Sequence, residues 1–227
     1  ELVAQCRIQV DTDLYLGDHM LDDTRVFPAA LALEIIAEAV EILSGVDGER
    51  KRLVMKDIEF TQAIVVPDTE QGLLLRVAAL VEQENQISCV IRCSDSGFQI
   101  DHVRATCMLL ADDASLTSPE MDIHANKELL PDFNVNSSLY KNILFQKGRF
   151  QRVAGYRHVE ASGCSAQLSP SDGVRWFDNS VRDGLLLGDP GIRDSVLHGV
   201  QACMPHRTLI PVSVAGVEVG QLRSDVS

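Results

Sequence analysis

One stretch of this chain is so apolar that it can fold only as a helix enclosed by other elements. Between residues 28 and 43 nearly every side chain is Ala, Leu, Ile or Val, and the charged residues Glu34, Glu38 and Glu41 follow one narrow helical face. The stretch begins with Pro28, which suits the first position of a helix. We therefore expect a helix over 28–43 that is buried around most of its circumference.

Strand-like runs surround this helix in the sequence. Segments with strand character cover 2–10, 53–66, 72–82, 86–94 and 98–110. The last two are separated by the turn sequence Ser-Asp-Ser-Gly, which indicates a hairpin. A long buried helix with consecutive antiparallel strands predicts a sheet wrapped around a central helix, the hotdog arrangement.

The second half of the chain repeats this pattern in a shorter form. Strand-like segments are expected over 139–145, 148–158, 164–168 and 208–219. A helix capped by Asp189 is expected from Pro190 to about Met204. Fewer strand residues follow this helix than the first one. The second unit is therefore short of strands, which indicates that the chain ends early or lacks residues here.

The second helix has two faces of different character. Its apolar residues form a stripe that consists of Ile192, Val196, Val200 and Cys203. Another face carries Asp194, His198 and Gln201, which are spaced by four and then three residues. An acid thus shares a helix face with a histidine one turn away.

A histidine precedes the first helix, much as this acid lies near the beginning of the second. His19 lies in the polar loop over 11–27, shortly before Pro28, and Asp194 follows Pro190 by four residues. One base and one acid on two similar elements predict general acid–base chemistry on a substrate held between them.

Charge and composition exclude several other functions. The net charge of −13 argues against nucleic acid as a partner, because phosphate binding needs a basic surface. No apolar run reaches membrane-spanning length and no signal peptide is visible, so we expect a cytoplasmic protein without a membrane contact. Cys89 and Cys93 have no matching second pair, so no metal site is expected.

One segment departs from the acidic average. Residues 141–158 contain five Lys or Arg side chains and no acid, among them Lys147, Arg149 and Arg152. A positive strip on an acidic body is a candidate docking surface for a small acidic partner or a phosphate. A solvated strand face explains the pattern equally well.

The order and spacing of these residues resemble the motifs of dehydratase domains from type I polyketide synthases, especially the iterative, enediyne-type ones. The family's first motif is His, three residues, Gly, four residues, Pro; His19 and Pro28 fit, and Asp23 stands at the glycine position. The second motif is Asp, three residues, then Gln or His, which Asp194 and His198 match. A third, aromatic–glycine–proline motif is matched only loosely by 145–150, and its tyrosine has no clear equivalent.

The resemblance implies an α+β double hotdog, in which two helix-wrapped antiparallel sheets form a pseudo-dimer within one chain. Residues 1–112 would form the N-terminal hotdog with the His motif, 113–136 a linker, and 137–227 the C-terminal hotdog with the Asp motif. The active site would lie between the halves. The implied reaction is that of a hydro-lyase, which removes water from a β-hydroxyacyl thioester on acyl carrier protein and leaves an α,β-enoyl thioester.

The resemblance also implies roles for the site residues. His19 would take the α-proton, and Asp194, kept protonated by an apolar pocket that raises its pKa, would protonate the departing hydroxyl. His198 would orient Asp194 or the hydroxyl. Backbone N–H groups near Phe27 and Pro28 would hold the thioester carbonyl. No cofactor is expected beyond the phosphopantetheine that carries the substrate.

The expected partners are acyl carrier protein and neighbouring synthase domains, with Lys147, Arg149 and Arg152 as the carrier-docking residues and a homodimer as a possibility. Two alternatives stay open at this point. A product-template-like cyclase would keep the fold and the His–Asp pair, and a catalytically silent hotdog would only bind the carrier. Asp23 is either neutral or disturbs the loop that places His19.

Overall fold

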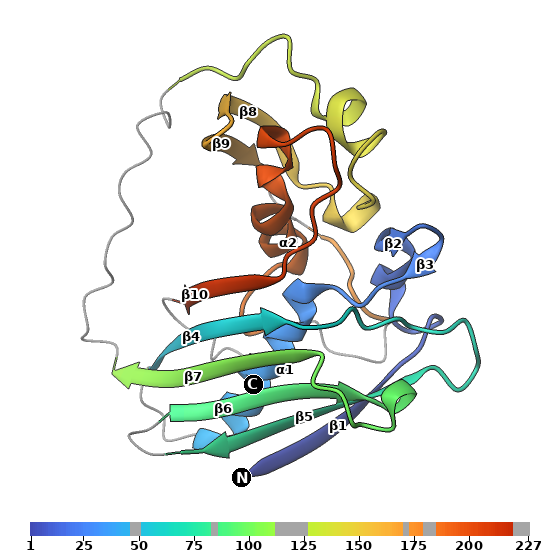
Figure 1. Ribbon diagram of the computed structural model, residues 1–227, viewed down its shortest axis with the longest axis vertical. Helices are drawn as coiled ribbons and strands as arrows, with labels where there is room; N and C mark the ends of the chain where they lie inside the picture. The colour runs from blue at the N-terminus through green and yellow to red at the C-terminus, as the bar shows by residue number, and fades with distance from the viewer. Residues whose placement is uncertain (46–50, 83–85, 112–126, 170–172, 179–184, 220–227) are drawn as a thin grey trace.

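The computed structural model describes residues 1–45, 51–82, 86–111, 127–169, 173–178 and 185–219 of the 227-residue chain. A six-stranded sheet dominates this part of the chain (Figure 1). In spatial order its strands are β1 (Leu2–Ile8), β5 (Leu73–Val81), β6 (Gln86–Cys93), β7 (Val103–Ala111), β4 (Lys51–Phe60) and β10 (Ser213–Val219). Every neighbouring pair is antiparallel.

The predicted central helix is confirmed as α1 (Ala29–Ser44), which packs against β1, β5 and β6. Pro28, the predicted first residue, is its N-cap, so the helix begins one position later than predicted, and Gly45 ends it with a positive φ of 71°. Alternate residues of β5 and β6 are buried, as expected for strands with one face on a core. Helix and sheet thus share one apolar core, and they form the predicted arrangement of a sheet wrapped around a central helix.

Strand β10 comes from the second half of the chain but completes the sheet of the first half. It pairs with β4 in antiparallel register, for example Val217 with Met55. The other strands in the described part of the second half form a separate hairpin, β8 (Val153–Glu160) and β9 (Gly163–Leu168). Figure 1 shows this hairpin beside the second helix and away from the six-stranded sheet.

The predicted strand over 139–145 is wrong. Residues Asn136–Tyr140 form a short helical turn, η4, in which Leu139 and Tyr140 are buried. The amide oxygen of Asn134 accepts from the N–H of Ser137, and Asn142 donates to the carbonyl of Ser137. Such local side-chain bonds to the backbone compete with a strand ladder, which explains why the turn forms here.

The second helix, α2 (Pro190–His198), continues as a 3₁₀ turn, η6 (Gly199–Cys203), close to the predicted length. Its exposure is the reverse of that expected from its apolar stripe. Val196 and Val200 are 63% and 48% exposed, whereas Asp194 and His198 are buried. The polar face is the inner one because its side chains find hydrogen-bond partners there.

A buried ion pair joins the two helices. Glu34 of α1 is 2% exposed and pairs with Arg193 of α2 at 2.8 Å. Glu34 also accepts from the backbone N–H groups of Leu186 and Leu187. Burial raises the pKa of Glu34, and Arg193 with these N–H groups opposes that rise. The pair fixes the approach of α1 to α2 and lies one residue from Asp194.

Two sequence predictions, the linker over 113–136 and the absence of a membrane-spanning helix, can be compared only with the described residues. Residues 113–126 of the predicted linker lie outside the described residues, so the domain boundaries stay a prediction. In the described part of the chain, none of the helices combines the length and apolar character that crossing a membrane would require.

Candidate active site

A two-residue hairpin positions His19. Strands β2 (Met20–Leu21) and β3 (Thr24–Arg25) pair directly across Asp22 and Asp23. Both of these residues have positive φ, 46° and 60°, as a type I′ turn requires. Glycine is preferred at such a position, but aspartate is among the residues that tolerate it. Asp23 therefore adopts the conformation that a glycine would have there.

The base of this hairpin fixes the tautomer of His19. The backbone N–H of Val26 donates to the carbonyl of His19, and Nδ1 of His19 lies 2.7 Å from the carbonyl oxygen of Val26. Because a carbonyl only accepts, Nδ1 must carry a hydrogen. When the ring is neutral, the free lone pair is therefore on Nε2. The ring is 4% exposed and packs against Phe145 and Phe150.

The loop before His19 is tied to the second half of the chain. The carboxylate of Asp18, in the 3₁₀ turn η1 (Leu14–Asp18), pairs with the guanidinium of Arg149 and accepts from its backbone N–H. The carbonyl of Asp18 accepts from the N–H of Lys147 at 2.8 Å. The backbone of His19 itself forms an isolated bridge to Gln146. Segment 146–149 therefore holds His19 opposite α2.

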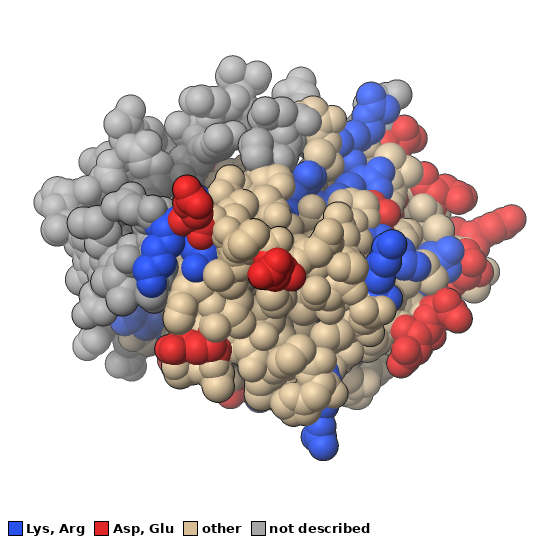
Figure 2. Space-filling view, turned by 90° about the horizontal axis from the view of Figure 1, so that it is seen from above, with Lys and Arg blue, Asp and Glu red and all other residues tan. Residues whose placement is uncertain are grey.

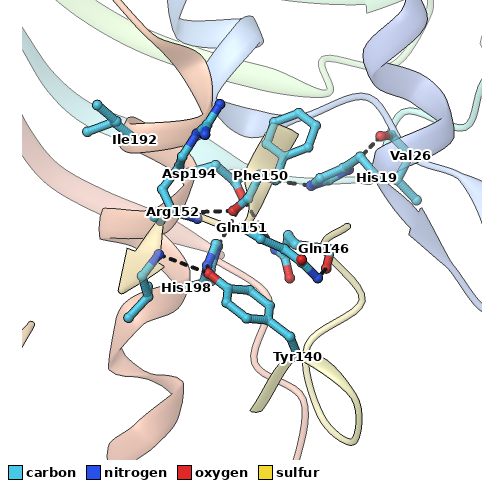
Figure 3. A network of polar contacts seen from close by, with 12 residues as sticks. His19, Val26, Tyr140, Gln146, Phe150, Gln151, Arg152, Ile192, Asp194 and His198 are labelled. Carbon is cyan, nitrogen blue, oxygen red and sulfur yellow. Dashed lines mark hydrogen bonds and ion pairs between the residues drawn. The ribbon is translucent and has the colours of Figure 1, made fainter. Parts of the chain in front are cut away.

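Asp194 reaches the same place from α2. Asp189 caps this helix through the N–H of Ile192 at 2.9 Å, which confirms the predicted cap, and Pro190 opens it. Oδ1 of Asp194 lies 3.8 Å from Nε2 of His19, and both side chains are almost fully buried. Two residues that lie 175 positions apart in the sequence thus converge, as Figure 3 shows.

The other carboxylate oxygen of Asp194 is held by two groups. Oδ2 lies 3.0 Å from Nδ1 of His198 and accepts from Nε2 of Gln146 at 3.3 Å. On its far side, Nε2 of His198 lies 3.2 Å from the hydroxyl of Tyr140. That hydroxyl accepts from the N–H of Val153, so its own hydrogen is free to bond to His198. A chain of polar contacts thus fixes the orientation of Asp194 and leaves Oδ1 toward His19.

The pKa of Asp194 differs from the sequence prediction. Burial acts to raise it, as expected, but the hydrogen bonds and charges of His19 and His198 outweigh burial. The pKa of Asp194 therefore lies well below its usual range in the substrate-free site. The prediction considered the apolar surroundings but not two imidazoles on one carboxylate.

These residues line a cavity of about 340 Å³ between the two halves. Much of its wall is apolar and includes Leu21, Phe60, Ile64, Leu197 and Ile210. The size is within the range of small-molecule sites, near its lower end. His19, Gln146, Asp194 and His198 supply its central polar groups, and His102 adds a further imidazole.

The predicted carbonyl-binding groups need a correction. Phe27 lines the cavity, but its N–H donates to the carbonyl of Ile64 at 2.9 Å, and Pro28 has no N–H. The next N–H groups, of Ala29 and Ala30, lie in the first turn of α1 and have no intrahelical acceptor. Ala29 also lines the cavity. The available donors are therefore one or two residues further along the chain.

The three predicted docking residues occupy different environments. Lys147 is exposed, whereas Arg152 is half-buried. Arg149 pairs with Asp18 and also donates to the carbonyls of Leu14 and Arg175, so it is engaged within the protein. On the face shown in Figure 2, most of the described surface is uncharged, and Lys and Arg side chains occur in separate groups that do not form one continuous band. The docking role itself stays a prediction.

Sequence reasoning missed two residues of the site, Tyr140 and Gln146. Tyr140 was placed in a strand that does not form, so its contact with His198 could not be anticipated. Gln146 lies within 145–150, the segment that matched the third family motif loosely, and that match was the one available signal. Among the described residues, no group of three His, Cys, Asp or Glu side chains is arranged to hold a metal ion.

Comparisons with known proteins agree with this architecture. The family model described as polyketide synthase dehydratase domain matches residues 1–93, and the model described as polyketide synthase dehydratase N-terminal domain matches 126–227. The dehydratase domain from the CurF module of curacin polyketide synthase superposes with a TM-score of 0.74 at 16% identity, and covers 97% of this chain and 78% of that one. A trans-AT dehydratase domain from Brevibacillus brevis gives 0.71 at 14% identity, with 98% and 78% covered.

Two curated relatives are much longer proteins. The highly reducing polyketide synthase cnsI of Penicillium expansum is 34% identical over 59 residues, which is 26% of this chain and 2% of that protein. The highly reducing polyketide synthase pkhB of Emericella nidulans is 31% identical over 80 residues, or 35% and 3%. The chain thus spans a small fraction of these synthases, and the enediyne subtype stays a prediction. The fold is the predicted α+β double hotdog, and the chain belongs to the polyketide synthase dehydratase domains.

Proposed function

We propose that this domain removes water from a β-hydroxyacyl thioester and gives the α,β-enoyl thioester. The observation that carries the proposal is the approach of His19 Nε2 to Asp194 Oδ1 at 3.8 Å, at the wall of a largely apolar cavity. The α-carbon and the β-oxygen of such a chain are separated by a single carbon. A base and an acid that serve both must therefore lie within a few ångströms of each other.

The elimination needs one proton to leave the α-carbon and another to reach the hydroxyl. Nε2 of His19 takes the α-proton, the electrons of the broken C–H bond form the C=C bond, and the C–O bond breaks as Oδ1 of Asp194 protonates the hydroxyl. The hydrogen bond from Nδ1 to Val26 keeps Nε2 available. Afterwards Nε2 carries a proton and Asp194 lacks one, so a transfer between them restores the pair.

The lowered pKa of Asp194 is compatible with an acid role if the pair shares one proton. In the substrate-free site the imidazoles stabilise the carboxylate. An acyl chain that enters between the two groups separates the charges in apolar surroundings, which disfavours the ionised pair. Neutral His19 and protonated Asp194 are then the more stable form. Because Ala29 lines the cavity at the start of α1, we infer that its N–H binds the thioester carbonyl, where the positive end of the helix opposes the developing negative charge.

As partners we infer an acyl carrier protein, whose phosphopantetheine presents the substrate, and neighbouring domains of a synthase in the cytoplasm. The family membership and the length of the curated relatives support this inference. We propose no further cofactor. The homodimer stays a prediction.

The reaction is tested with the N-acetylcysteamine thioester of 3-hydroxybutyrate by following formation of the crotonyl product. We expect turnover by the parent chain and a loss of at least a hundredfold in His19→Ala and in Asp194→Asn. His206→Ala, an exposed histidine outside the cavity, is the control and should retain full activity. No turnover by the folded parent with this or the carrier-bound substrate contradicts the proposal and favours a silent carrier-binding domain. Ring closure of a polyketone substrate without dehydration would favour the cyclase.

A further inference from the structure

Gln146 connects the two catalytic side chains. Its backbone forms a bridge to His19, and its Nε2 donates to Oδ2 of Asp194 at 3.3 Å. The residue is 4% exposed and lines the cavity. Figure 3 shows it on the segment that faces α2, between His19 and Tyr140. It is therefore positioned beside the acid and the base at once.

The amide of Gln146 is only half satisfied. Within the described part of the chain its Oε1 is buried and has no hydrogen-bond partner. The orientation of the amide is set by the carboxylate of Asp194, which can only accept and so selects Nε2. Oε1 is left as an acceptor without a donor, a condition that buried polar atoms rarely keep.

The substrate of the proposed reaction supplies such a donor. Its β-hydroxyl receives a proton from Asp194 but also carries a hydrogen of its own, which needs an acceptor once the cavity excludes water. We propose that Oε1 of Gln146 accepts the hydrogen bond of the β-hydroxyl and so selects β-hydroxyacyl chains. The inference rests on the proposed function, because it assigns the leaving group of that reaction to one more residue.

A glutamine suits this position better than a charged acceptor. A glutamate would place a second negative charge beside Asp194, and its oxygens could not donate to Oδ2. The amide instead donates to the acid and accepts from the hydroxyl that the acid protonates. When the C–O bond breaks, the departing water holds its original hydrogen and the one from Asp194, and Gln146 is unchanged.

The test measures binding apart from turnover. In a His19→Ala background, which does not consume substrate, the Kd values of two N-acetylcysteamine thioesters are measured by NMR titration, those of 3-hydroxybutyrate (each enantiomer) and of butyrate. Adding Gln146→Met should weaken binding of one 3-hydroxybutyryl enantiomer about tenfold, the range expected for one hydrogen bond, and leave the butyryl Kd within twofold. Gln151→Met is the control, because Gln151 donates to the backbone of Gln146 but does not line the cavity.

Equal weakening of both ligands, no change in either, or no detectable binding in the background variant overturns the role of Gln146. If Gln146→Met fails to fold, Gln146→Asn withdraws the amide by one methylene and is expected to give the same selective loss. Turnover by the parent chain is scored separately. A parent that binds the hydroxyl through Gln146 without dehydrating it therefore contradicts the proposed function and leaves this contact standing.

Discussion

The most informative perturbation of the site's support is a single methyl group on Gly148. This residue has a φ of +45°, and a Cβ built on it would lie 2.6 Å from Oδ1 of Asp18. The carboxylate of Asp18 cannot move away easily, because it is held by its ion pair with Arg149. Gly148→Ala should therefore force Asp18 away, and His19 is the next residue in the chain.

The expected loss of unfolding free energy in Gly148→Ala has two contributions. A left-handed φ costs about 1 kcal/mol for alanine relative to glycine. Losing the hydrogen bonds of a half-buried carboxylate costs about 2 kcal/mol more. The sum of about 3 kcal/mol corresponds to a fall in Tm of about 9 °C for a chain of this size. We also expect kcat/KM to fall at least tenfold, since the base is displaced from Asp194.

Alanine substitutions at two other glycines distinguish these two contributions. Gly17 lies in the same loop, is outside the positive-φ region and has open space around its missing Cβ, so Gly17→Ala should leave Tm unchanged. Gly97 has a φ of +59° and equally open space, so Gly97→Ala should show the conformational cost alone, about 3 °C. Thermal melts followed by circular dichroism measure all three. The reasoning is refuted if Gly148→Ala has the same Tm as Gly97→Ala or keeps full activity.

Three further predictions concern the turn, the acid and the docking surface. Asp23→Gly should raise Tm by about 3 °C without changing kcat, because it relieves a positive φ; a lower Tm would show that Asp23 has a role of its own. Since the pKa of Asp194 is lowered in the folded state, its stabilising effect is present above the unfolded value of about 3.9 and is lost as pH falls through the native one. Denaturant titrations should therefore show the unfolding free energy of the parent minus that of Asp194→Asn decreasing below about pH 4, and a constant difference would contradict the ionised state. Lys147→Glu should weaken carrier binding at low salt whereas Lys56→Glu, on β4, should not, and equal affinities would exclude Lys147 from the docking surface.

The sequence predicted the parts of the fold that follow from periodicity and from end signals. Helix α1 was predictable because an apolar stretch of that length has to be enclosed, and α2 because Asp189 and Pro190 mark its start. The positions of His19 and Asp194 before and within these helices were predictable from the repeat. The short distance between these two side chains could not be predicted, because it depends on contacts between distant segments, such as Glu34 with Arg193 and Asp18 with Arg149.

The errors have a common physical origin. The segment over 139–145 has strand propensity, but local side-chain bonds from Asn134 and Asn142 favour a helical turn. The pKa of Asp194 was expected from burial alone, which raises it, but His19 and His198 together lower it. Arg149 was counted as a surface charge because its partner Asp18 is 131 residues away. In each case specific side-chain contacts, local for the turn and tertiary for Arg149, outweighed a propensity or composition pattern.

The central claim is that His19 and Asp194 together remove water from a carrier-bound chain. It is tested most directly by loading an acyl carrier protein with a 3-hydroxyacyl group, adding this chain, and following the mass of the intact carrier. The parent should lower that mass by one water, whereas His19→Ala and Asp194→Asn should leave it unchanged over the same time although both remain folded. Equal loss of water with either variant, or no loss with the parent, would contradict the claim.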